Sequence, residues 1–97
     1  MSYAAFYARV KGKVQGVGFR YSAVREADRL GINGWVNNAL NGDVEVWAEG
    51  SPQSLDRFLK WLHRGPQYSR VDSVEMEEKE PQGYDGFGVA SNFDVKY

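Results

Sequence analysis

The sequence contains no cysteine among its 97 residues. This absence excludes disulfide bonds, thiolate nucleophiles and metal sites built from thiolates. A chain without cysteine is compatible with a reducing compartment.

Long apolar runs are also missing, since none approaches the roughly 20 residues that a helix needs to cross a bilayer. The first residues carry no basic leader ahead of an apolar stretch and start directly with an alternating pattern, so we expect no signal peptide. Together these observations predict a cytoplasmic protein that does not bind a membrane.

Neither sign of charge dominates, because 12 lysines and arginines stand against 13 aspartates and glutamates, with a net charge of -1. Proteins that bind the nucleic-acid backbone usually carry a clear basic surplus, so we expect no nucleic-acid partner. Basic residues do gather in the first third of the chain, namely Arg9, Lys11, Lys13, Arg20, Arg25 and Arg29. A basic end on a neutral protein suits a small anionic ligand better than a polyanion.

The length and an apolar fraction of 42% predict a single domain over residues 1–97. Hydrophobic periodicity predicts strands over residues 4–14, 34–38, 43–49, 70–78 and 92–97, helices over residues 19–30 and 52–64, and a loop over residues 81–88. The order βαββαβ, with a terminal strand added, is typical of the ferredoxin-like α/β sandwich. In this α+β fold two helices cover one face of an antiparallel sheet.

Side-chain alternation also predicts which residues build the core. In the strand over residues 43–49, Val44 and Val46 should face the helices, whereas Glu45 and Trp47 should face outward. We interpret the large aromatic residues as packing residues and not as a ligand-binding group; these are Trp35, Trp47, Phe58 and Trp61.

The most informative segment is the run from Lys13 to Arg20, which joins a predicted strand to a predicted helix. Gly16 and Gly18 allow the backbone to curl so that its N–H groups point into one concavity. The helix start adds free N–H groups and a positive dipole end, and Arg20 adds a planar two-pronged donor. These groups could bind a phosphate, although the glycines alone are equally compatible with a simple tight turn.

A second candidate, Asn38, ends the strand before a predicted hairpin at Asn41 and Gly42. Its amide could accept a hydrogen bond from a water while it donates to a substrate. An asparagine at this place could equally cap the turn through its own backbone.

Two segments of the sequence resemble the signatures of the acylphosphatase family. The first is Gly-Lys-Val-Gln-Gly-Val-Gly-Phe-Arg at residues 12–20. The second is Leu-Gly-Ile-Asn-Gly-Trp-Val-Asn-Asn at residues 30–38, followed by Asn-Gly-Asp-Val-Glu at residues 41–45. Residues 48–50 and 93–97 also resemble the family, so the likeness covers nearly the whole chain. Departures lie at Asn37, where many members carry a basic residue, and at residues 67–70.

The resemblance implies hydrolysis of acyl phosphates to a carboxylate and inorganic phosphate within the same ferredoxin-like sandwich. It implies that Arg20 binds the phosphate and that Asn38 positions the water. The backbone amides of the loop would bind phosphate oxygens, which gives the phosphate-binding set Gln15, Gly16, Val17, Gly18, Phe19 and Arg20. The family also implies that the substrate's own phosphate oxygen accepts the proton.

The sequence shows no spacing of aspartate, glutamate or histidine that is typical of a metal site, so we predict neither a metal nor a cofactor. The only histidine, His63, is expected late in the second helix as a surface or boundary residue. We therefore expect no phosphohistidine intermediate. The expected partner is a small acyl phosphate, and we expect a monomer.

Three other functions stay open at this stage. The chain could be a phosphate sensor that does not catalyse, but such a binder has no need of a water-positioning asparagine. It could be an acylphosphatase-like module of a larger carbamoyl-transfer enzyme, although its start at Met1 and its end after the last predicted strand favour a free-standing enzyme. A nucleic-acid-binding ferredoxin-like domain is disfavoured by the balanced charge and the missing aromatic consensus.

Overall fold

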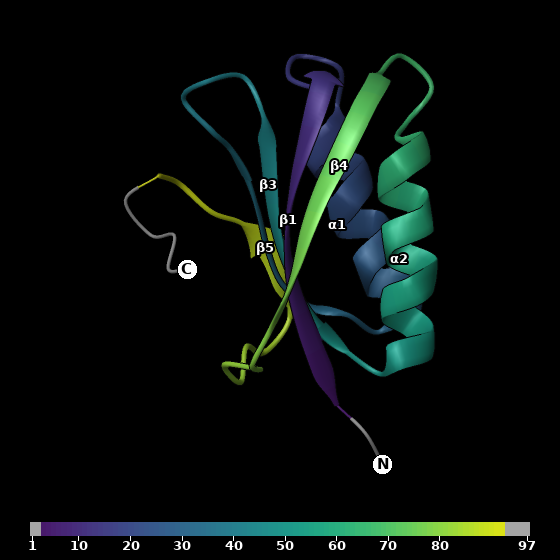
Figure 1. The fold of residues 1–97 in the computed structure, drawn as a ribbon, viewed down its shortest axis with the longest axis vertical. Helices are drawn as coiled ribbons and strands as arrows, with labels where there is room; N and C mark the ends of the chain where they lie inside the picture. The colour runs from purple at the N-terminus through teal and green to yellow at the C-terminus, as the bar shows by residue number, and fades with distance from the viewer. Residues whose placement is uncertain (1–2, 93–97) are drawn as a thin grey trace.

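Five strands form one sheet, and two helices cover one of its faces (Figure 1). The computed structural model describes residues 3–92. The elements along the chain are β1 (Ala4–Lys13), α1 (Phe19–Leu30), β2 (Asn33–Asn38), β3 (Val44–Gly50), α2 (Pro52–Arg64), β4 (Arg70–Lys79) and β5 (Phe87–Val89). The predicted ferredoxin-like α+β sandwich is confirmed, and its first six elements lie within a few residues of their predicted bounds.

The sheet has the strand order β4-β1-β3-β2-β5. Strand β1 lies antiparallel to β3 and β4, and β2 lies antiparallel to β3, as predicted. Strand β5, however, pairs parallel to β2, so the sheet is mixed and not wholly antiparallel.

The prediction of a loop over residues 81–88 is wrong at its end, where β5 begins at Phe87. Strand β5 has only three residues, and a segment this short with a central glycine carries no alternating signal. Its strand conformation comes from the free edge of β2, where Ala90 donates to the carbonyl of Val36 at 2.8 Å and Gly34 donates to the carbonyl of Gly86 at 2.9 Å. The strand predicted over residues 92–97 lies outside the described residues, except for Asn92, which is in a turn.

The second helix begins and packs as its sequence predicts. The hydroxyl of Ser51 accepts a hydrogen bond from the N–H of Ser54 at 3.2 Å, and Pro52 occupies the first turn. The apolar stripe of α2 is buried against the sheet through Leu55, Phe58, Trp61 and Leu62. Neither of the two helices in the described part of the chain is long and apolar enough to cross a membrane.

Part of the face of the sheet away from the helices, over β2 and β3, is also buried, which corrects part of the prediction for β3. Glu45 and Trp47 do lie on this face, but they are only 5% and 1% exposed. The reason is that the chain after β4 crosses this face, so that its residues cover the side chains beneath. A second apolar cluster results, made of Tyr7, Trp35 and Trp47 with Tyr84 and Ala90 packed against it.

Glu49, on β3, binds the segment that crosses this face through residues 82–84. Its carboxylate is fully buried and accepts hydrogen bonds from the N–H groups of Gln82, Gly83 and Tyr84, the last two at 3.0 and 3.1 Å. The indole N–H of Trp47 donates to the same carboxylate at 2.8 Å. A buried carboxylate is stable only when hydrogen bonds replace its hydration, so Glu49 needs these four donors. The buried donors in turn need the carboxylate as their acceptor.

Replacing this carboxylate should destabilise the protein. Glu49→Ala leaves the indole N–H and three backbone N–H groups without their acceptor, so we expect a loss of about 3 kcal/mol in the free energy of unfolding. Urea denaturation followed by tryptophan fluorescence measures this loss.

Glu75→Ala is the matched control, because Glu75 is half exposed and paired with Arg9 on the surface. This variant should lose no more than about 1 kcal/mol. Equal losses in the two variants would contradict the anchoring role of Glu49.

Candidate active site

The loop between β1 and α1 contains two glycines in the left-handed conformation. Gly16 and Gly18 both have φ of 75°, in the left-handed region, and a Cβ added at either would meet no atom within 4 Å. The glycines are therefore needed for the backbone conformation and not for space. Left-handed residues of this kind occur in turns whose successive N–H groups form an anion-binding concavity.

Electrostatics at the start of α1 also favour an anion. The first turn of α1 contains no acidic residue, and Arg20 lies there. A cation at the positive end of a helix dipole costs about 0.3–1 kcal/mol, and the first N–H groups of a helix have no partner within the helix. A bound anion would satisfy both features at once, since it would neutralise the charge and accept from the free N–H groups.

The side chain of Gln15 ties this loop to the hairpin between β2 and β3. Its amide nitrogen donates to the carbonyls of Ala39 at 2.8 Å and Asp43 at 2.9 Å. The ammonium of Lys11, near the end of β1, adds a salt bridge of 3.0 Å to the carboxylate of Asp43. Because Ala39 follows Asn38 directly, the same hydrogen bonds hold Asn38 beside the loop.

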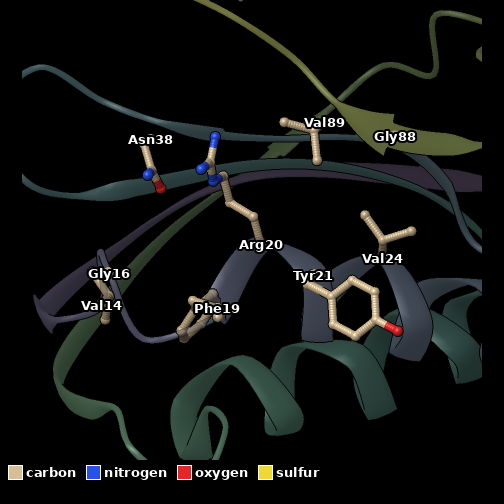
Figure 2. Close-up of a pocket in the computed structure, with 10 residues that line it drawn as sticks. Val14, Gly16, Phe19, Arg20, Tyr21, Val24, Asn38, Gly88 and Val89 are labelled. Atoms are coloured by element: carbon tan, nitrogen blue, oxygen red, sulfur yellow. The ribbon is translucent and has the colours of Figure 1, made fainter.

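A pocket of about 470 Å³ opens between the loop, the start of α1 and the strands β2 and β5. Figure 2 shows that the side chains of Arg20 and Asn38 both extend into it from opposite sides. The pocket is lined by Val14, Gly16, Gly18, Phe19, Arg20, Tyr21, Val24, Asn38, Gly88 and Val89. Arg20 is the only Lys, Arg, Asp, Glu or His side chain among these described lining residues, so the pocket is positively charged.

The amide oxygen of Asn38 is buried and has no hydrogen-bond partner among residues 3–92. An unpaired buried acceptor costs about 1–3 kcal/mol, which indicates a place for a donor such as water. The alternative that Asn38 caps the hairpin through this oxygen is not observed. Asn41 does so instead, since its side-chain oxygen accepts from the N–H of Asp43 at 3.0 Å.

Comparison with known proteins assigns this chain to a family. The family model for acylphosphatase matches residues 6–89. The chain belongs to the acylphosphatase family. It is 47% identical to an acylphosphatase from Thermococcus kodakarensis over 83 residues, which are 86% of this chain and 91% of that protein.

Solved acylphosphatase structures have the same fold. The acylphosphatase from Coxiella burnetii superposes with a TM-score of 0.88 at 39% sequence identity, over 91% of this chain and 93% of that one. Membership of the acylphosphatase family makes the chain a hydrolase that acts on small acyl phosphates. This assignment favours an enzyme over the phosphate sensor and the nucleic-acid-binding domain that the sequence left open.

The acylphosphatase fold also forms part of a longer protein. HypF from T. kodakarensis superposes with a TM-score of 0.79 at 32% identity, over 94% of this chain but only 12% of that one. The fold therefore exists both as nearly a whole acylphosphatase and as a small part of another chain.

The structure brings the predicted site residues together and adds others. Arg20, Asn38, Gly16, Gly18 and Phe19 all line the pocket. Of the remaining predicted loop residues, Val17 packs against the core and Gln15 uses its side chain for the hairpin.

Sequence reasoning missed Gly88 and Val89, because β5 itself was not predicted. It also missed Tyr21 and Val24. The helical spacing could have revealed Val24, which lies one turn after Arg20 on the same face of α1.

Two neighbouring asparagines have different surroundings. Asn37 is 2% exposed and donates to Glu45 at 3.0 Å and to Asn92 at 2.8 Å, within the far face of the sheet. Asn38 lies on the opposite face of the same strand and reaches the pocket, because side chains alternate along β2. The departure from the family pattern at Asn37 therefore lies away from the pocket.

Gln15→Glu should remove the two hydrogen bonds that attach the loop to the hairpin. The new carboxylate would face two carbonyl oxygens with no hydrogen to donate, so we expect a loss of about 2 kcal/mol in the free energy of unfolding. Gln67→Glu makes the same change at an exposed position and should stay within about 0.5 kcal/mol of the wild type. Urea denaturation of both variants tests this, and equal stabilities would contradict the role of Gln15.

Proposed function

We propose that Arg20 and the loop bind the phosphate of an acyl phosphate and that Asn38 positions the attacking water. The phosphate-binding backbone would be that of Gln15, Gly16, Val17, Gly18, Phe19 and Arg20. The observation that carries this proposal is the buried amide oxygen of Asn38, which has no hydrogen-bond partner among the described residues. It belongs to a pocket in which Arg20 is the one charged residue among the described lining residues. An acceptor without a donor beside a phosphate site is suited to hold one hydrogen of a water molecule.

The proposed reaction needs position and charge stabilisation more than it needs acid or base. The water oxygen attacks phosphorus, the bond between phosphorus and the acyl oxygen breaks, and the carboxylate leaves with the electron pair. A carboxylate is a good leaving group, so no proton donor is required. Arg20 and the loop N–H groups stabilise the charge on the equatorial phosphate oxygens as it changes in the transition state.

The proton of the attacking water needs an acceptor. The described lining residues of the pocket include no histidine and no carboxylate. We propose that an oxygen of the substrate phosphate accepts this proton, and that the reaction needs no metal. His63 is exposed and does not line the pocket, which supports a route without a phosphohistidine.

We also propose that the chain works as one domain and as a monomer. Support comes from the single sheet of residues 3–92 and from a pocket that its own strands and α1 build. The cytoplasmic location stays a prediction from the sequence.

Asn38→Ala should lower turnover and leave phosphate binding intact. The variant removes a group that acts on the water and not on the phosphate, so we expect kcat for benzoyl phosphate to fall by at least about 10²-fold. Competitive inhibition by inorganic phosphate should stay within about twofold of the wild type, since Arg20 and the loop remain. Steady-state kinetics with a chelator present measures both quantities.

Each part of this scheme has its own contradicting result. Wild-type turnover in Asn38→Ala would contradict the role in positioning water. Loss of wild-type activity on addition of the chelator would contradict the reaction without a metal.

A further inference from the structure

The pocket that binds the phosphate continues into an apolar wall that the reaction described above does not use. Tyr21 and Val24 reach this wall from α1, and Val89 reaches it from β5. In Figure 2 these three side chains lie on the far side of Arg20 from Asn38 and Gly16. The pocket therefore has a polar end and an apolar end, with Arg20 between them.

The direction of phosphoryl transfer decides which part of the substrate meets the apolar end. The attacking and leaving oxygens lie roughly in line on opposite sides of phosphorus. If Asn38 holds the water on one side of a phosphate at Arg20, the acyl oxygen leaves toward the other side. The acyl group would then extend over Tyr21, Val24 and Val89.

The exposure of this wall fits such an occupant. Tyr21 is 68% exposed and Val89 is 57% exposed, although both line the pocket. An apolar acyl group would remove part of this surface from water, which is favourable at about 25 cal/mol per Å². The guanidinium carbon of Arg25 lies 5.8 Å from the centre of the Tyr21 ring, a contact that helps hold the ring in place.

We infer that Tyr21, Val24 and Val89 form an acyl-binding wall that selects acyl phosphates with an apolar or aromatic acyl group. This inference rests on the proposed function, because it takes the phosphate position and the direction of attack from it. No Lys, Arg, Asp, Glu or His side chain among the described lining residues faces the acyl group besides Arg20. Arg25 lies against the Tyr21 ring but does not line the pocket, so an acyl group with its own carboxylate gains no ion pair with a described lining residue other than Arg20.

The test compares benzoyl phosphate with acetyl phosphate, which share the reacting group and differ in apolar surface. Tyr21→Ala should lower kcat/KM for benzoyl phosphate about fivefold and leave that for acetyl phosphate within about twofold. Val89→Thr keeps the side-chain shape of a β-branched residue and should act in the same direction, by about threefold. Inhibition by inorganic phosphate should not change in either variant.

Tyr68→Ala is the matched control, because Tyr68 is 75% exposed and does not line the pocket. This variant should leave kcat/KM unchanged for both substrates. Equal losses for both substrates in Tyr21→Ala, or equal effects of Tyr21→Ala and Tyr68→Ala, would overturn the acyl-binding wall alone. Failure of the wild type to hydrolyse either substrate would overturn the proposed function, and the wall with it.

Discussion

The whole site depends on the turn between β1 and α1 and on the hydrogen bonds that attach this turn to the hairpin between β2 and β3. Two glycines with φ of 75° let the turn curl, and Gln15 fixes it to the carbonyls of Ala39 and Asp43. Without the two hydrogen bonds the loop would lose its side-chain link to the hairpin that follows β2. The attached turn therefore brings Arg20 and Asn38 to the same pocket, although they are 18 positions apart in the sequence.

The far face of the sheet supports this pocket indirectly. Glu49 holds the chain after β4 through three successive N–H groups, and this chain then leads to β5 on the edge of β2. Strand β5 supplies Val89 to the pocket from that edge. A buried carboxylate on one face of the sheet is thus linked through a short segment to the wall of the pocket on the other face.

Periodicity predicted most of the fold, because each of the first six elements has a local signal. The family resemblance pointed to Arg20 and Asn38, which line one pocket, and their roles there stay a prediction. Strand β5 could not be predicted, since three residues become a strand only through a long-range pairing with β2. Glu45 was predicted to face outward, and its burial could not be predicted because its hydrogen-bond partners Tyr7 and Asn37 lie on other strands. The side chain of Gln15 was missed for the same reason.

The central claim is that the loop and Arg20 bind a phosphate, and amide NMR with added inorganic phosphate tests it directly. The account predicts that the largest shifts fall on the backbone N–H groups of residues 16–20. It also predicts that Arg20→Ala weakens binding at least about tenfold, whereas Arg57→Ala, which changes an exposed arginine on α2, does not. Shifts centred elsewhere, or an affinity that is unchanged in Arg20→Ala, would contradict the account.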